Sequence, residues 1–133
     1  MNEASKIVYV CSTPSTAFLH GVRFRELPKR QCELSWCADT GSGDNANIAL
    51  VFSRVQTFKC TYHYAIPIEK YTLAYDKLVV LQESECLREV RARLSAHHEE
   101  SPQRLKHFLI CFDDGPLYEF FAEDFEVSEA ITR

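Results

Sequence analysis

The chain has 133 residues, of which 46% are hydrophobic and 26% charged, and its formal net charge is −4. These values are typical of one globular domain, so we expect residues 1–133 to fold as a single domain. The sequence has no apolar run near the roughly 20 residues of a membrane helix, and its start lacks the basic and apolar regions of a signal peptide, so we expect a cytoplasmic protein without a membrane partner.

The first half of the chain has the pattern of short strands. Residues 5–13 are rich in β-branched and aromatic side chains, which predicts a first strand that Pro14 ends. A second short strand is expected within residues 15–27. In "CELSWCA", apolar and polar residues alternate with a period of two, as in a half-buried strand. The glycine-containing segment 39–47 lacks the Lys and the following helix of a phosphate-binding loop, so we interpret it as a plain loop.

The second half predicts further strands, one main helix and a C-terminal hairpin. Residues 47–55 and 56–65 have the patterns of two long strands, or of one strand with a bulge near residues 53–56. Leu87, Val90 and Leu94 recur at helical spacing after Ser84, which can cap a helix over about residues 84–98. Two strand-like segments, "LKHFLICF" and "LYEFFAEDFEV", flank a short turn that contains Gly115. This layout predicts an α+β fold with a mostly antiparallel sheet.

The cysteines and histidines lack the spacing of a known metal-binding or catalytic motif. The chain has six cysteines and no CxxC pair, and in a reducing compartment we expect free, structural thiols. Cys60 and Cys111 lie mid-strand among aromatic residues, which predicts a core environment for both. No cofactor motif is present, and we predict neither a cofactor nor a metal site.

The acidic residues concentrate at the C-terminal end. Residues 1–107 carry 14 basic and 12 acidic residues, whereas residues 108–132 carry seven acidic and no basic residues. Such a block repels nucleic acid, and it favours a protein partner with a basic surface. We therefore predict a partner-binding surface, interleaved with aromatic side chains, whose leading residues are Asp113, Asp114, Tyr118, Glu119, Glu123 and Asp124.

Other interpretations of the same residues stay open. The acids can simply keep a sheet edge soluble and unpaired. A carboxylate pair such as Glu119 with Glu123, or a Cys/His pair, would be needed for an enzyme, and we predict that the protein is not one. A small-ligand or scaffold-binding module is the main alternative to a protein-binding role. The basic stretch 23–30 is a second candidate surface.

Several segments together resemble a known class of proteins. "FLHGVRFREL", "CELSWCA", "IALVFSRVQTFKCTY" and "HFLICFDDGPLYEFFAEDFEV" resemble small immunity proteins of bacterial polymorphic toxin systems, including an F-x-x-V phrase at residues 52–55. The resemblance implies a cytoplasmic, non-enzymatic protein that neutralises a cognate toxin by binding it. It carries over no binding residue, because members of the class differ in the toxin they block.

Overall fold

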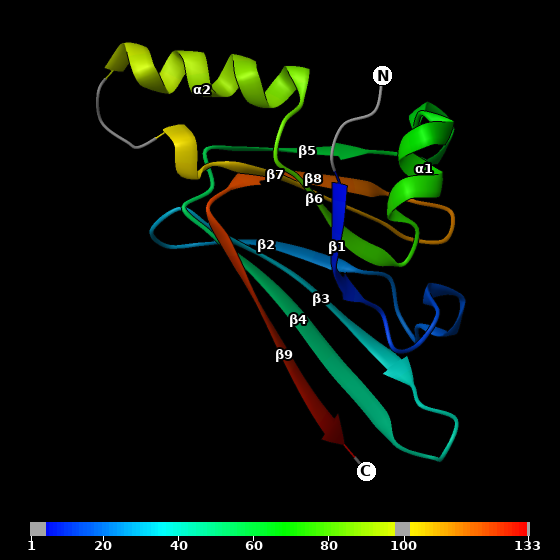
Figure 1. Cartoon of the computed structure of the whole chain (residues 1–133). Coiled ribbons are helices and arrows are strands. Elements are labelled where there is room, and N and C mark those ends of the chain that lie inside the picture. The colour runs from blue at the N-terminus through cyan, green and yellow to red at the C-terminus, as the bar shows by residue number, and fades with distance from the viewer. Residues whose placement is uncertain (1–4, 98–101, 133) are drawn as a thin grey trace.

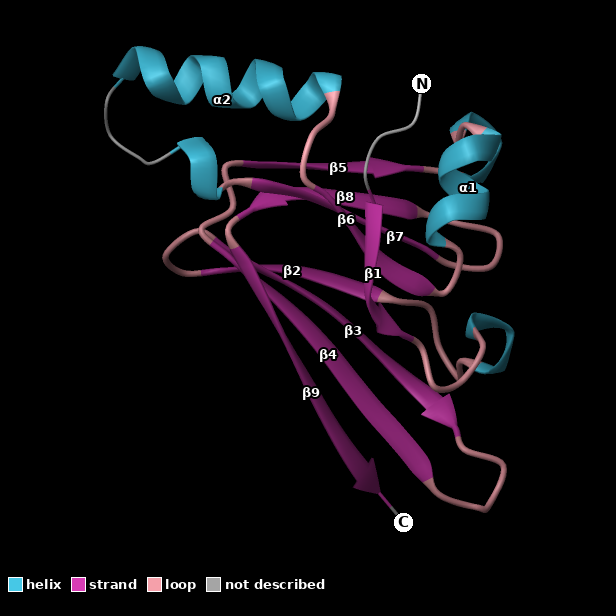
Figure 2. Cartoon of the chain, in the orientation of Figure 1, coloured by secondary structure: helices cyan, strands magenta, loops and turns pink. Residues whose placement is uncertain are grey.

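The structure is a computed structural model that describes residues 5–97 and 102–132. These residues form nine strands in two antiparallel sheets that pack face to face (Figure 1). Two helices lie on the side of one sheet that faces away from the other sheet (Figure 2). The α+β class with mostly antiparallel strands, expected from the sequence, is therefore confirmed.

The larger sheet has five strands and is called the five-stranded sheet below. Its spatial order is β1, β6, β7, β8, β5, with β1 and β5 at its edges. The strands are β1 (Ser5–Val10), β6 (Lys77–Leu81), β7 (Lys106–Cys111), β8 (Leu117–Ala122) and β5 (Thr57–Thr61).

The four-stranded sheet has the order β2, β3, β4, β9. Its strands are β2 (Arg23–Leu27), β3 (Gln31–Asp39), β4 (Asn45–Ser53) and β9 (Asp124–Thr132). The far ends of β3, β4 and β9 extend beyond the other sheet (Figure 1). The loop that carries the short helix η1 (Ser15–Ala17) folds back here, because Phe18 stacks on Trp36 with ring centroids 5.3 Å apart.

The burial patterns of the strands follow from these layers. In β3 and β4 buried and less buried residues alternate, because one face of the four-stranded sheet meets the core and the other meets solvent. In β8 all six residues are buried, because the other sheet covers one face and the helices cover the opposite one. Phe120 and Phe121 are therefore adjacent and both buried, which explains why simple alternation fails there.

The C-terminal hairpin is confirmed for β7 and β8, but the segment after it differs from the prediction of one strand over residues 117–127. Instead β8 ends at Ala122, and after Glu123 the chain crosses to the four-stranded sheet, where it pairs with β4 as β9. The aromatic core holds the two sheets together across this crossover: Phe52 of β4 stacks on Phe120 of β8 with centroids 4.1 Å apart.

The main helix is confirmed as α2 (Glu85–His97), and position 98 of the prediction lies outside the described residues. Ser84 caps it, because its Oγ accepts the Leu87 N–H at 3.0 Å. Leu87 is fully buried and packs against Phe121, whereas Val90 and Leu94 are half-buried.

Two local features depart from the sequence analysis. The short helix α1 (Ile68–Ala74), which begins after Pro67, was not predicted; the short helix η2 (His63–Ala65) precedes it, and η3 (Pro102–Arg104) precedes β7. Cys60 is exposed on the edge strand β5, so its predicted core environment is wrong, while Cys111 is buried as expected.

Candidate interaction surface

The acidic residues of the C-terminal block do not form one surface. Glu119 and Tyr118, expected to face a partner, are only 2% and 8% exposed inside β8, so their placement on a binding surface was wrong. Asp113 and Asp114 lie in the turn between β7 and β8. Glu123 and the residues of β9 lie beyond the other end of β8.

Glu119 belongs to a buried polar network between the five-stranded sheet and the helices. Its Oε1 accepts a hydrogen bond from Lys70 Nζ of α1 at 3.0 Å and lies 2.8 Å from His107 Nε2. Burial acts to raise the pKa of Glu119, but the hydrogen bonds and charges of His107 and Lys70 outweigh it and lower the pKa. The carboxylate is therefore charged at neutral pH and stabilised by its two partners.

The network continues to Ser84 in an order that resembles a catalytic triad. Ser84 Oγ lies 2.9 Å from His107 Nδ1, and His107 Nε2 faces Glu119, so a serine, a base and an orienting carboxylate are in line. However, Ser84 and His107 are only 4% and 2% exposed, and Ser84 Oγ already accepts the Leu87 N–H. A substrate could reach that oxygen only if the start of α2 moved away. The arrangement accounts for the capping of α2 and for the burial of Glu119.

The turn between β7 and β8 contacts the helical segment that follows β5. A Cβ on Gly115 would lie 3.1 Å from the backbone N of His63 and 3.3 Å from Ile66 Cδ1, and Gly115 has a φ of 76°, so a side chain here would be strained and would push the two segments slightly apart. Tyr75, at the end of α1, donates its hydroxyl to Asp113 Oδ1 at 3.0 Å. The backbone N–H of Asp113 in turn donates to Ser15 Oγ at 2.8 Å. The turn is thus fixed from three segments.

A row of rings leads from this turn to solvent. Tyr75 and Tyr71 have centroids 5.4 Å apart, His63 lies 6.1 Å from Tyr71, and Tyr64 lies 4.9 Å from His63. Tyr64 is fully exposed, and Tyr62 and Ile68 are 75% and 69% exposed. We call this region the tyrosine–aspartate surface; its members are Tyr62, His63, Tyr64, Ile68, Glu69, Tyr71, Tyr75, Asp113 and Asp114.

The charge of the tyrosine–aspartate surface comes from its carboxylates. Burial raises the pKa of Tyr75 to about 12, with a further contribution from the hydrogen bond to Asp113. Burial and the charge of Asp113 also raise the pKa of Tyr71, against a backbone hydrogen bond at Asp114. Both hydroxyls therefore stay protonated at neutral pH. The surface combines carboxylates with exposed aromatic rings, which is typical of a site that binds a basic protein.

The exposure of the aromatic part of this surface was not predicted from the sequence. Tyr62 and Tyr64 fall within the strand predicted over residues 56–65, but β5 ends at Thr61, and η2 follows and leaves both rings in solvent. The sequence contains the two tyrosines directly after the strand, but no local pattern indicates that the strand ends before them. The contact at Gly115 and the ring row from His63 to Tyr75 bring this segment beside Asp113 and Asp114.

The remaining predicted acids lie at the opposite end of the five-stranded sheet. Glu123 is half-buried, with its Oε1 3.9 Å from Arg54 Nε. Asp124 is exposed at the start of β9, and Glu126 and Glu129 are exposed along it. Because β9 is an edge strand, these acids fit the alternative in which charge keeps a sheet edge unpaired. Glu119 and Glu123 have different partners and do not form a catalytic pair.

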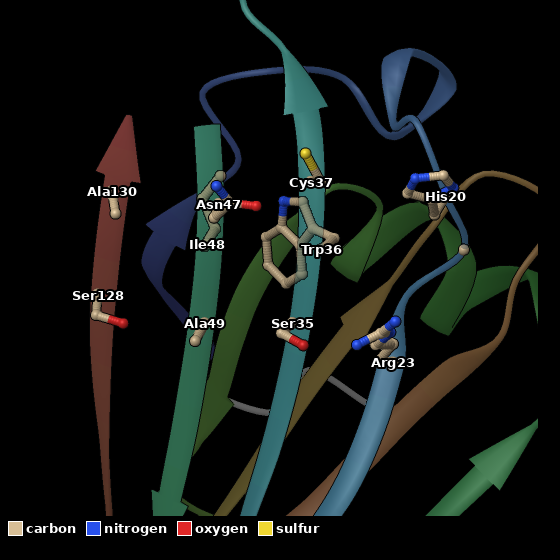
Figure 3. A pocket seen from close by; sticks show the side chains of 11 residues that line it. His20, Arg23, Ser35, Trp36, Cys37, Asn47, Ile48, Ala49, Ser128 and Ala130 are labelled. Atoms are coloured by element: carbon tan, nitrogen blue, oxygen red, sulfur yellow. The ribbon is translucent and has the colours of Figure 1, made fainter. Parts of the chain in front are cut away.

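The outer face of the four-stranded sheet contains a shallow hollow of about 560 Å³. Figure 3 shows its floor, where Ser35, Ala49 and Ser128 form a row across three strands, with His20 and Arg23 at one rim. The hollow results from small side chains on a solvated sheet face. Its polar lining residues are His20, Arg23, Ser35, Asn47 and Ser128, which come from all four strands of the sheet and from the loop before β2.

Among the described residues, no three His, Cys, Asp or Glu side chains are grouped as metal ligands. Within residues 5–97 and 102–132, none of the helices is long and apolar enough to cross a membrane. No protein-family model, curated protein or solved structure matches the chain.

Proposed function

We propose that the protein is a non-catalytic binding protein that recognises a basic protein partner through the tyrosine–aspartate surface. The observation that carries this proposal is the contact between the Asp113–Asp114 turn and the ring row that ends at the fully exposed Tyr64. More specifically, we propose that the protein is an immunity protein, which neutralises a cognate toxin in the cytoplasm. The resemblance to immunity proteins described above motivates this specific form.

The two kinds of side chain have different tasks in this proposal. Tyrosine rings bury a large area at a small cost in conformational entropy, and Tyr is enriched among the residues that dominate binding energy. Tyr62 and Tyr64 are therefore the proposed anchors. Carboxylates at the rim steer a basic partner and increase the association rate more than the affinity. Asp113 and Asp114 take this role, and Glu69 in the first turn of α1 adds a further exposed carboxylate.

Nuclease toxins provide one suitable partner class. An enzyme that acts on nucleic acid needs a basic cleft, and an acidic inhibitor can occupy that cleft in place of the phosphates. The proposed partner is thus a toxin domain with a basic surface. The partner-facing set differs from the one expected from sequence, because Tyr118 and Glu119 are buried and Glu123 and Asp124 lie at the opposite end.

The test is a growth and binding experiment with the proposed partner, a toxin domain that has a basic surface. Expression of that domain alone should arrest growth, and co-expression of this chain should restore it. The double variant Tyr62→Ala/Tyr64→Ala should lose the rescue and weaken binding at least about tenfold, since two anchors are removed. The control is Val10→Ala, at an exposed apolar residue on β1 outside the surface, which should keep the rescue. Full rescue by the double variant would contradict the proposed surface.

A further inference from the structure

A slot opens between the two sheets at the side where the edge strands β1 and β9 lie. Its volume is about 230 Å³, and its floor is apolar, formed by Val8 of β1, Val80 of β6, Phe108 of β7 and Phe125 of β9. Val80 and Phe108 belong to the core between the sheets, and the rings of Phe108 and Phe125 meet edge to face with centroids 5.6 Å apart. The slot therefore brings apolar core residues to the surface of the molecule.

Four polar residues complete the lining of this cavity, which we call the β1–β9 slot: Lys6, Gln82, Lys106 and Asp124. Lys6 pairs with Val80 and Val80 pairs with Phe108, so the three residues form one row across the five-stranded sheet and share its inner face. Asp124 approaches from the other sheet, at the start of β9. Charged groups from both sheets therefore surround one apolar floor.

The charged groups at the rim of the slot can bind a ligand. Lys106 Nζ donates one hydrogen bond to the Glu123 carbonyl at 3.1 Å, which leaves its other N–H donors for a ligand. Lys6 and Asp124 are exposed, and within residues 5–97 and 102–132 neither of them forms a hydrogen bond or an ion pair. The carboxylate of Glu123 lies beside Arg54, with Oε1 3.9 Å from Nε. The rim thus offers two ammonium groups and one carboxylate.

We propose that the β1–β9 slot binds a free α-amino acid with an apolar side chain, such as leucine. The ammonium groups of Lys6 and Lys106 bind the α-carboxylate, Asp124 accepts the α-ammonium group, and the side chain lies on the apolar floor. The volume holds about seven groups of the size of a water molecule, at about 30 Å³ each, which is enough for the α-carbon and side chain of leucine.

Other classes of ligand fit this lining less well. A fatty acid leaves Asp124 beside an apolar chain without a cation, and an alkylamine leaves both lysines without an anion. The volume of the slot is also smaller than the roughly 300–1,000 Å³ of pockets for drug-sized ligands. Its size therefore favours a small ligand over a nucleotide or a long lipid, and its charges favour a zwitterion.

Binding can be measured by NMR on the ¹⁵N-labelled full chain at constant ionic strength, with four small probes. L-Leucine should give saturable shifts at the amides of Lys6, Val8, Gln82 and Phe125, with a Kd on the order of millimolar for a ligand of this size. 4-Methylpentanoate lacks the ammonium group and 3-methylbutylamine lacks the carboxylate, so each should bind at least about tenfold more weakly. L-Asparagine has the shape of leucine, and it should be similarly weak because the floor cannot hydrogen-bond its amide.

Two single-charge variants assign the roles of the rim residues. Lys6→Gln and Asp124→Asn change exposed side chains, so both variants should fold, and each should weaken leucine binding at least about fivefold. In Asp124→Asn the preference for leucine over 4-methylpentanoate should shrink, because the ammonium group has lost its anion. The matched controls Lys59→Gln on β5 and Glu126→Gln on β9 remove the same charges outside the slot and should bind leucine like the wild type.

Three results would overturn the proposal. Shifts with leucine that do not saturate, or equal weakening by the control variants, would show that the slot holds no specific site. Equal affinity for 4-methylpentanoate would show an anionic amphiphile as the ligand, with no role for Asp124. Equal affinity for asparagine would show that the apolar floor takes no part. None of these results bears on the tyrosine–aspartate surface, so the two proposals fail independently.

Discussion

Glu119 shows at the scale of one residue how an acidic pattern can mislead. Six of the seven acids in residues 113–129 lie in turns or on the edge strand, and Glu119 alone is inside the protein. A buried carboxylate needs charged partners, and here they come from residues 70 and 107, far away in sequence. Its place in an otherwise apolar strand, between Tyr118 and Phe120, was the only sign in the sequence.

Replacement of Glu119 by Gln should destabilise the fold by about 2–3 kcal/mol at pH 7, because Lys70 and His107 would lose their shared anion. This expected loss of stability is smaller than for a fully buried ion pair, because the Lys70 side chain is 31% exposed. Urea unfolding measures it. Glu126→Gln, at an exposed acid on β9, is the control and should change the free energy of unfolding by less than about 0.5 kcal/mol. Similar effects of both variants would contradict the buried network.

Wild type and Glu119→Gln should also differ in their response to acid. The pKa of Glu119 is lower in the folded protein than its ordinary value of 4.5, so its contribution is complete above about pH 4.5 and disappears as the pH falls through the folded value. The stability difference between the two proteins should therefore shrink below about pH 4.5. Urea unfolding at a series of pH values from about 7 to about 3.5 measures this. A difference that grows on acidification would contradict the direction of the shift.

The thiols provide a second test at the residue scale. Cys60 and Cys86 are exposed to reagents, whereas Cys32 and Cys111 are buried, and burial raises the pKa of each of these two to about 11. Partial burial of its thiol also raises the pKa of Cys60, but its side chain stays accessible. A thiol reagent at about pH 8 should therefore modify Cys60 and Cys86 first, and six thiols should react after denaturation without reductant. Cys60→Ser and Cys86→Ser should each remove one fast thiol. Fewer than six thiols in the denatured protein would indicate a disulfide.

At the scale of elements, the helices and strands that could be predicted from the sequence are those whose buried residues recur at a regular spacing. β3 alternates because one of its faces is solvated, and α2 repeats Leu87, Val90 and Leu94 after a serine cap. The crossover from β8 to β9 could not be predicted, because both segments continue as strands and only the pairing partner changes. α1 was missed because its seven residues are too few to show a helical period.

The residues on the buried face of α2 should contribute unequally to the free energy of unfolding. Leu87 is fully buried against Leu105 and Phe121, so Leu87→Ala should cost about 2–5 kcal/mol. Leu94 is only half-buried near the end of α2, and Leu94→Ala should cost about 1 kcal/mol, less than a fully buried leucine would. Urea unfolding of the two variants compares them directly, since the substitution is identical. An equal or larger effect at Leu94 would show that the helix packs by its other end.

At the scale of the whole molecule, the sequence indicated that acids and aromatic rings occur together but not how the fold arranges them. The combination of acids and aromatic rings was expected along one hairpin, and it occurs instead between the β7–β8 turn and the segment after β5. These segments are far apart in sequence, and no local pattern records that Gly115 touches His63. Acidic residues that are close in sequence are thus separated in space when the strand between them runs from one end of a sheet to the other.

The division of the acidic block predicts that only one part of it steers a partner. Asp113→Asn/Asp114→Asn should slow association with the proposed basic partner by about three- to tenfold and leave dissociation nearly unchanged, because rim charges act mainly on encounter. The amide oxygen introduced at position 113 still accepts the Tyr75 hydroxyl, so the turn should persist.

The control Glu126→Gln/Glu129→Gln removes the same charge from β9 and should leave the association rate within about twofold of wild type. Stopped-flow or surface-binding kinetics measure both variants at about 50 and about 500 mM salt, where the Debye length falls from about 14 to about 4 Å and the wild type should approach the Asp variant. If instead the β9 variant is the slower one, the acids steer from the sheet edge, and the partner docks at β9 rather than at the tyrosine–aspartate surface.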